Sequence, residues 1–269
     1  MATVDLGADS AYPERYDPSL LRKIPRTQNR GRLANIRAFS GWDLWTAWEL
    51  SWLNAQGIPE VAVAEFKIDC NSVNIVESKS FKYYLNSLNQ CEFAAREDLV
   101  RTLTRDLTEL VEGEIGIQLR DVDGGAESAA IPGRCLDNIS LPRPAFVLDT
   151  SLLRGTDRPV QNERVYTNLF KSNCPVTAQP DWASVWIEYS GTAIEETGLL
   201  SYLLGYRKHQ GFHEDCVEKI YCDILESVPV SALTVFARYT RRGGLDINPL
   251  RSSENIYIES IPFGRTLRQ

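Results

Sequence analysis

The apolar residues of this chain recur with two periods. Apolar and polar side chains alternate in five stretches, at 61–70, 115–119, 185–189, 233–239 and 256–258. This period of two predicts β-strands. A spacing of three and four, which predicts helices, occurs at 95–111, 199–206 and 216–228 and also relates Trp45, Trp48 and Trp52. The pattern therefore predicts an α+β protein with antiparallel strands and a buried tryptophan helix after Gly41.

The predicted elements follow the same order in both halves of the chain. A shift of 119 residues superposes Asn54 on Asn173, Ala64 on Ala183, Ile68 on Ile187, Glu77 on Glu196 and Tyr83 on Tyr202. The helices that follow need a further shift of one or two residues. Turn residues over 124–144 mark the boundary between the halves. We expect one module over 1–150, beginning with an irregular arm over 1–40, and a second over 151–269, each with two helices on one face of its strands.

Composition excludes several classes of protein. The chain has 269 residues, 43% hydrophobic and 24% charged, which is ample for a packed core. The net charge is −7 and no basic patch dominates, so nucleic acid is not an expected direct partner. No apolar run is long enough for a membrane span, and the polar N-terminus lacks the pattern of a secretion signal. We therefore expect a cytoplasmic protein.

Cysteine and histidine are poorly arranged for a metal site. The six cysteines are scattered, without the C-x-x-C spacing of a zinc or redox site. Such cysteines fit a reducing compartment, where most are small buried apolar groups. Only His209 and His213 supply imidazole, so no metal is expected.

The run 172–181 (SNCPVTAQPD) contains a candidate nucleophile. Proline after Cys174 disfavours a helical backbone at the cysteine, so Cys174 is expected on a shaped loop just before a strand. A thiolate there is a good nucleophile, and the carboxylate of Asp181 is a candidate for moving its protons. From spacing alone, however, a lone cysteine is more often buried and inert.

Three further segments carry polar side chains that suit a ligand. In the run 212–215 (FHED), Glu214 is able to accept hydrogen bonds from the N–H edge of a guanine-like base, although acidic residues often simply begin a helix. In the run 77–84 (ESKSFKYY), Lys79 suits a phosphate and Glu77 a substrate amine, whereas the plainer interpretation is a serine-capped helix with solvated lysines. In the run 241–244 (RRGG), the arginines suit a phosphate as well as they suit an ordinary hairpin turn.

The signatures of dinucleotide and phosphate-loop binding are absent. The chain contains no G-x-G-x-x-G and no G-x-x-x-x-G-K-[ST]. The residues alone therefore do not lead to a nicotinamide cofactor.

Taken together, these segments resemble the NADPH-dependent 7-cyano-7-deazaguanine reductases of queuosine biosynthesis, a tRNA modification pathway. The run 77–84 is similar to the family motif E-[SL]-K-[SA]-x-K followed by two aromatic or apolar residues, and 174–181 is similar to its catalytic loop. The runs 212–215 and 241–246 also match, as do 41–43 and 49–53 of the long, two-module form. The resemblance covers nearly the whole chain.

The two halves divide the family motifs between them. The first half keeps Glu77, Lys79 and Lys82 but has Ala55 where the overlay places Cys174. The second half keeps Cys174 but has Gly198 and Ser201 where Lys79 and Lys82 would fall. A single active site shared between the modules explains this division.

The resemblance implies two tandem modules of the tunnelling fold, in which modules join their sheets, and a homodimer. It implies that Cys174 attacks the nitrile carbon to give a covalent thioimide, that Asp181 moves protons, and that His213 supplies a proton or shields the intermediate. Two molecules of NADPH would then reduce each nitrile to the primary amine, 7-aminomethyl-7-deazaguanine. The implied substrate-binding residues are Val76, Glu77, Ser78, His213 and Glu214. The implied cofactor-binding residues are Ser78, Lys79, Arg242 and Gly243.

Three alternatives have a different chemistry. A cyclohydrolase of the same fold group would need zinc held by cysteine and histidine. A non-catalytic purine-binding module would bind its ligand without covalent capture. A nitrile hydrolase would pass through the same thioimide but release an amide or an acid.

Overall fold

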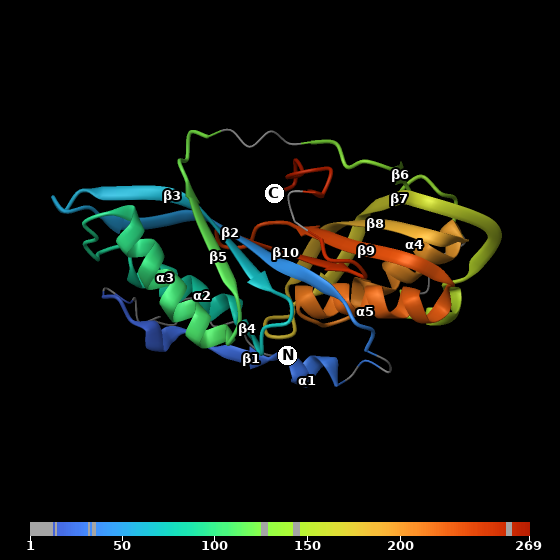
Figure 1. Ribbon diagram of the computed structural model, residues 1–269, viewed down its shortest axis with the longest axis horizontal. Coiled ribbons are helices and arrows are strands. Elements are labelled where there is room, and N and C mark those ends of the chain that lie inside the picture. The colour runs from blue at the N-terminus through green and yellow to red at the C-terminus, as the bar shows by residue number, and fades with distance from the viewer. Residues whose placement is uncertain are drawn as a thin grey trace.

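One continuous sheet runs the length of the molecule (Figure 1). The computed structural model describes residue 13 and residues 15–31, 33, 36–124, 129–141, 146–256 and 260–269. The sheet has eight strands in the order β5-β3-β2-β10-β9-β8-β7-β6, and every neighbouring pair is antiparallel except β6 with β7. The structure is therefore α+β, as predicted.

The strands alternate with pairs of helices along the chain. The strands are β1 (Lys23–Pro25), β2 (Ser40–Leu53), β3 (Pro59–Asp69), β4 (Asn74–Val76), β5 (Ile115–Arg120), β6 (Arg134–Cys135), β7 (Gly155–Asn173), β8 (Pro180–Ile194), β9 (Val230–Tyr239) and β10 (Leu245–Ser252). The α-helices are α1 (Arg26–Arg30), α2 (Ser78–Ser87), α3 (Arg96–Val111), α4 (Glu196–Gly205) and α5 (His213–Ser227). The short 3-10 helices are η1 (Pro18–Leu20), η2 (Thr150–Leu152) and η3 (Tyr206–Lys208). The predicted strands at 61–70, 115–119, 185–189 and 233–239 and the predicted helices at 95–111, 199–206 and 216–228 are confirmed.

The two halves meet where β2 pairs with β10. The pairing runs without interruption from Ser40 opposite Ser252 to Ala47 opposite Leu245. Gly41 allows this close approach, because it has φ +143° and a Cβ there would lie 2.0 Å from the carbonyl oxygen of Leu250. The joint thus depends on a position that only glycine fits.

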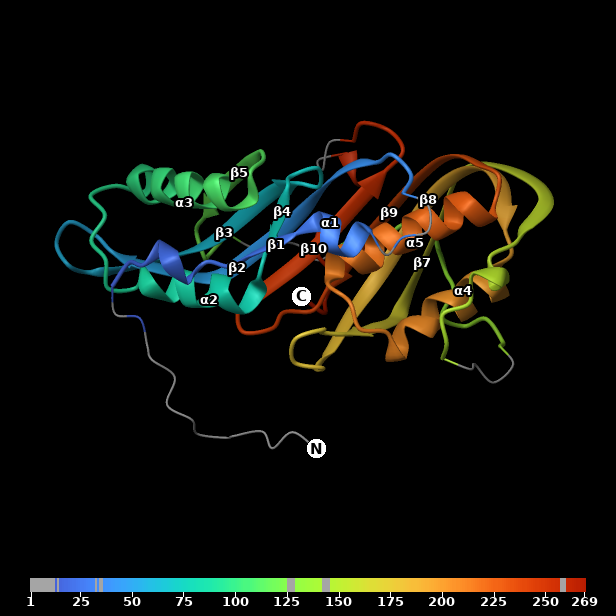
Figure 2. The same ribbon diagram turned by 90° about the horizontal axis from the view of Figure 1, so that it is seen from below.

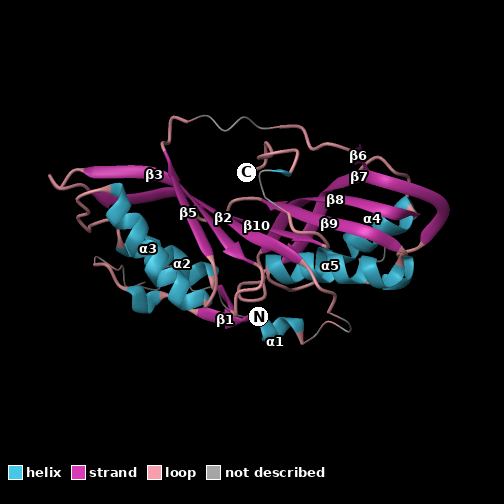
Figure 3. Cartoon of the chain, in the orientation of Figure 1, coloured by secondary structure: helices cyan, strands magenta, loops and turns pink. Residues whose placement is uncertain are grey.

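The long helices cover one face of the sheet and the C-terminal segment covers the other (Figures 1 and 2). In the first half, β2 and β3 pack on α2 and α3. Leu99, Leu103 and Leu107 of α3 are completely buried in this core. In the second half, β8 and β9 pack on α4 and α5. Ile261 and Phe263 pack on Trp186 and on other residues of the opposite face. Figure 3 shows this layered arrangement coloured by element type. The layers determine which ends of the strands lie beside the N-termini of the helices.

The internal repeat is visible in matching polar contacts. Glu77 caps α2 and Glu195 caps α4, each accepting hydrogen bonds from two backbone N–H groups of the first turn. Tyr84 donates to Asp106 at 2.6 Å between α2 and α3, and Tyr202 donates to Asp223 at 2.5 Å between α4 and α5. These contacts correct the sequence overlay by one residue in this region, because Tyr84 rather than Tyr83 corresponds to Tyr202.

The predicted tryptophan helix is wrong, because these residues belong to β2. The pairing of β2 with β3 shifts register between Ala47 and Leu50, and such a bulge reverses the alternation of side chains. Trp45 and Trp52 consequently pack on the same helix-covered core, although they stand seven positions apart and a regular strand would point them to opposite faces. Trp48 lies within the bulge, where its Nε1 donates to Asp246 at 2.7 Å. Because of the bulge, the buried tryptophans of this strand have the sequence spacing expected of a helix.

Three other expectations need correction. β10, which was not predicted, is the last strand among the described residues; of the strand expected at 256–258, Ile256 is irregular and residues 257–258 lie outside the described residues. The described part of the arm over 1–40 is more regular than expected, since η1, β1 and α1 lie within it. The cap of α2 is Glu77 rather than a serine. No helix in the described part of the chain is long and apolar enough to cross a membrane.

Candidate active site

Cys174 is the first residue of the hairpin loop between β7 and β8. Its backbone N–H donates to the carbonyl of Gln179 at 2.9 Å, and its carbonyl accepts from Ala178 at 2.9 Å. Ala178 has φ +55°, a conformation that few residues other than glycine adopt, and the loop closes tightly through it. The predicted shaped loop before a strand is confirmed.

The thiol of Cys174 is half-buried, and its surroundings favour the thiolate. Burial raises the pKa of Cys174, but hydrogen bonds to the sulfur from the Thr177 hydroxyl and from the backbone N–H groups of Thr177 and Val176 outweigh it and lower the pKa. A thiolate is the nucleophilic form of cysteine. The other thiols in this structure are also free, and those of Cys70 and Cys216 are buried with raised pKa values.

Asp181 is the first carboxylate beyond this loop, on β8. Its side chain is 3% exposed, forms an ion pair with Arg242 and lies 3.4 Å from Nε2 of His213. Burial alone would raise the pKa of Asp181, but the contacts with His213 and Arg242 hold it below its usual range. Arg242 also donates to the Thr177 hydroxyl at 3.3 Å. Asp181 is therefore an ionised group held beside the cysteine loop.

His213 is the first residue of α5, and its ring lies flat on Tyr239 of β9. The ring centroids are 3.7 Å apart and the planes differ by 6°. Stacking and the contact with Asp181 fix the ring, while Nδ1 is buried without a hydrogen-bond partner among the described residues. A ring fixed in this way presents its polar atoms in one orientation.

Glu214, the next residue, is buried without a charge partner of its own. It is 3% exposed, and its Oε1 makes no hydrogen bond within the described part of the chain. Burial, and then the nearby Asp43 carboxylate, raise the pKa of Glu214 to about 8. A buried polar atom without a partner is costly, so it marks a place where a ligand can supply the missing hydrogen bond.

These residues line one pocket of about 550 Å³, a figure that includes its open mouth. The first half contributes Trp45, Val76, Ser78 and Lys82. The second half contributes Cys174, Pro175, Val176, Asp181, Gly211, Phe212, His213, Glu214, Thr240, Arg242, Leu245 and Ile247. Cys174 and the 77–84 segment therefore face one cavity within a single chain.

Three predicted site residues do not line this pocket. Glu77 uses its two carboxylate oxygens on the N–H groups of Lys79 and Ser80, at 2.8 and 2.7 Å. Lys79 is exposed on the first turn of α2. Gly243 lies in the β9–β10 turn against Lys82, where a neighbouring groove begins.

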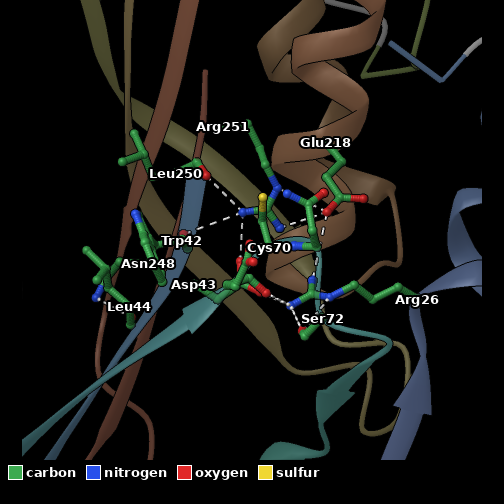
Figure 4. Close-up of polar contacts among 12 residues, drawn as sticks. Arg26, Trp42, Asp43, Leu44, Cys70, Ser72, Glu218, Asn248, Leu250 and Arg251 are labelled. Carbon is green, nitrogen blue, oxygen red and sulfur yellow. Dashed lines mark hydrogen bonds and ion pairs between the residues drawn. The ribbon is translucent and has the colours of Figure 1, made fainter. Parts of the chain in front are cut away.

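Sequence reasoning did not assign Lys82 to the site, although it lies in the quoted motif. Burial and the charge of Arg242 lower the pKa of Lys82, which lines both the pocket and the neighbouring groove. A cluster of buried charges near Glu214 was also missed (Figure 4). Its members come from distant segments, so no local pattern marks it.

The repeat shows how the first half differs at the equivalent positions. Leu53 and Asn173 each form a parallel bridge with the loop before a helix. The residue after Leu53 is Asn54, so Asn54 rather than Ala55 stands where the second half has Cys174. The two glutamate caps likewise align Lys79 with Thr197 and Lys82 with Leu200, not with Gly198 and Ser201. Neither correction restores the thiol or the lysines to the half that lacks them.

A thiol with a lowered pKa, an ionised carboxylate beside it and a pocket with an unpartnered glutamate are features that a cysteine-dependent enzyme would need. Within the described residues, no group of three or more histidine, cysteine, aspartate or glutamate side chains is arranged to hold a metal ion.

The comparisons with known proteins specify the class. Residues 12–119 match the family profile described as nitrile reductase, 7-cyano-7-deazaguanine-reductase N-term, and residues 180–257 match that of QueF-like protein. The chain is 48% identical to the NADPH-dependent 7-cyano-7-deazaguanine reductase of Teredinibacter turnerae, over 92% of this chain and 90% of the relative. It is 45% identical to the enzyme of that name from Colwellia psychrerythraea (100% and 97% covered) and 42% to that from Saccharophagus degradans (100% of both). The chain belongs to the family of NADPH-dependent 7-cyano-7-deazaguanine reductases.

Proposed function

We propose that this protein reduces the nitrile of 7-cyano-7-deazaguanine to the primary amine with NADPH, through a thioimide on Cys174, as a step of queuosine biosynthesis. The observation that carries the proposal is the shared pocket, in which the activated thiol and Glu214 face the same cavity. Membership of the family supports the overall reaction.

The first step is addition of the thiol to the nitrile. The sulfur of Cys174 bonds to the carbon of the C≡N group, and one proton goes to nitrogen, which gives a neutral thioimide. The N–H groups of the cysteine loop lower the pKa of the thiol, so that the thiolate is available. Asp181 accepts the thiol proton and passes it to the nitrile nitrogen, since it is ionised and held beside the loop.

Reduction needs two hydrides for each nitrile. When bound, NADPH supplies a hydride to the thioimide carbon and, from a second molecule, to the imine carbon. Cleavage of the C–S bond between these steps returns Cys174 as a thiolate. Asp181, whose contacts with His213 and Arg242 keep it in place, delivers the protons that nitrogen takes up. His213, stacked on Tyr239, covers the intermediate on one side.

Base recognition falls to Glu214 and to the wall formed by Val76 and Ser78. A guanine-like base has two adjacent N–H donors, at the ring nitrogen and the exocyclic amine, and Glu214 has the buried acceptor that matches them. Glu77 lies outside the pocket lining and caps α2, so its part in binding the base is limited to the lone pairs that its capping hydrogen bonds leave open.

The cationic residues near the pocket fit a dinucleotide phosphate. Lys82 and Arg242 line the pocket from opposite halves, and Lys79 lies exposed one turn before Lys82 on α2. Gly243, with φ +59°, leaves room for Lys82 and for a ligand backbone. We assign cofactor contacts to these residues and to Ser78.

We further propose that each half is a tunnelling-fold module, with a boundary near residue 150, and that the protein is a homodimer. The repeated helix caps and tyrosine–aspartate contacts of the two halves support the two modules, whereas the dimer rests on the resemblance alone. Sedimentation of the pure protein tests the dimer.

The function is tested by measuring NADPH oxidation with the purified protein and the nitrile. We expect two NADPH consumed per nitrile, the amine as product, and no turnover by Cys174→Ala. An amide or acid product would favour nitrile hydrolysis, and stoichiometric zinc with chelator-sensitive activity would favour a cyclohydrolase. Binding of the nitrile without turnover would favour a purine-binding module.

A further inference from the structure

A cluster of buried charges lies where the N-terminal segment crosses from one half to the other (Figure 4). Arg26 and Arg30 come from α1, Asp43 from β2, Glu218 from α5 and Arg251 from β10. Apart from Arg30, which is 17% exposed, their side chains are at most 3% exposed. Charged groups are rarely buried to this degree unless they are paired.

The pairs connect the two halves through Arg26 and Arg251. Arg26 donates to Asp43 at 2.5 Å and lies 3.9 Å from Glu218. Arg251 lies 2.8 Å from Asp43 and donates to Glu218 at 2.7 Å. Arg30 binds Glu218 through two nitrogens, at 2.9 and 2.8 Å.

Arg26 is held firmly by the first half. Its guanidinium also donates to Ser72 at 3.1 and 3.2 Å and to the carbonyl of Asp69 at 3.3 Å. Its backbone N–H donates to the carbonyl of Val73 at 3.1 Å. The charge on Arg26 therefore has a fixed position relative to β4, whose last residue, Val76, lines the pocket.

The cluster has one positive charge in excess, since three arginines face two carboxylates. Glu214 lies one helical turn before Glu218 on α5, where side chains four apart share a face. Burial and Asp43 raise the pKa of Glu214, and Arg26 opposes them. The neighbouring Asp215 is also partly uncharged near neutral pH, because burial and then the charge of Glu218 raise its pKa to about 7. An ionised Glu214 would bring the cluster to neutrality.

We propose that Arg26 is a positioning residue of the substrate site, which supplies the balancing charge for Glu214 when Glu214 accepts two N–H donors from the bound base. The inference rests on the proposed function for the identity of that base. The N-terminal segment would then contribute to substrate recognition. A protonated Glu214 would direct its O–H at the N–H donors of the base, whereas the carboxylate only accepts hydrogen bonds, and Arg26 favours the carboxylate.

The test compares the KM for the nitrile with the KM for NADPH in Arg26→Met. We expect the KM for the nitrile to rise by about tenfold or more, with the KM for NADPH and the maximal rate within about twofold of wild type, because one charge-supported acceptor is weakened. Arg26→Lys should recover part of the loss. The nitrile KM should fall with rising pH in both proteins as Glu214 ionises, and this fall should come at a higher pH in Arg26→Met than in wild type, because Arg26 no longer favours the ionised form. Lys23→Met is the matched control, because Lys23 lies on the same N-terminal segment and forms only an exposed ion pair with Glu112.

A merely structural role would change all kinetic constants together and would leave the pH dependence of the nitrile KM as it is in wild type. An unchanged nitrile KM in Arg26→Met, with an active wild type, would overturn the inference and leave the proposed function standing. If Arg26→Met does not fold, Arg26→Gln, which removes the charge but keeps a side chain able to donate hydrogen bonds to Ser72, takes its place. If the wild type does not reduce the nitrile, the function fails, and calorimetric binding of guanine-like bases to the same variants decides the inference separately.

Discussion

Replacing Glu214 by glutamine should stabilise the protein increasingly as pH rises. The folded protein holds the proton of Glu214 up to about pH 8, whereas an unfolded chain releases it at the ordinary value near 4.5. Between these two values the folded state binds the extra proton, so wild-type stability falls as pH rises. Glutamine has no proton to release and does not lose this stability.

The size of the effect follows from the shift in pKa. At about 1.4 kcal/mol per unit, the advantage of Glu214→Gln should grow by about 4 kcal/mol between pH 5 and pH 9. Urea unfolding at several pH values measures it, and Glu109→Gln, an exposed position on α3, is the control that should follow wild type. Parallel curves for Glu214→Gln and wild type would refute the assignment of a buried, unpaired carboxyl. The same variant should lose affinity for the nitrile. Glu214 would then be a residue that serves substrate binding although it lowers the stability of the folded protein.

Three further predictions concern the thiol, its proton carrier and the joint between halves. Thr177→Val should raise the midpoint of the pH dependence of Cys174 alkylation by about one unit, because a hydrogen bond to the thiolate is lost; an unchanged midpoint would contradict the assignment. Asp181→Asn should lower turnover about 10²–10⁴-fold in the NADPH assay while the nitrile still binds, and a near-normal rate would exclude Asp181 as proton carrier. Gly41→Ala should destabilise the protein by about 3 kcal/mol or more in urea unfolding, since its Cβ would overlap the carbonyl of Leu250; a small loss would show that the β2–β10 joint can shift.

Periodicity predicted those elements that have one buried face. The helix α3 and the strand β5 each present one regular apolar face, and their residues show the expected spacing. β10 was missed because all its residues are buried, including Asp246 and Arg251, which tertiary pairing satisfies. A strand buried on both faces has no alternation to detect.

The long strand β7 was missed for the opposite reason. Most of its first ten residues are exposed and polar, so hydrophobicity gives no period there. The β2 bulge misled because one extra residue turns a period of two into an apparent helical spacing. In each case pairing with other strands determines the structure, and the local sequence does not contain that information.

The site was predictable where its residues lie in short runs. Cys174 and Asp181 flank one hairpin, and His213 and Glu214 begin one helix. The charged cluster was not predictable, because Arg26, Asp43 and Glu218 come together only through the fold.

The central claim is a covalent bond between the Cys174 sulfur and the nitrile carbon. Intact-protein mass spectrometry after mixing protein and nitrile without NADPH measures it, and peptide mapping locates it. The account predicts one adduct per chain on Cys174, absent in Cys174→Ala and retained in Cys135→Ser, which removes another half-buried thiol. An unmodified Cys174 in protein that binds the nitrile, or an adduct on another residue, would contradict it.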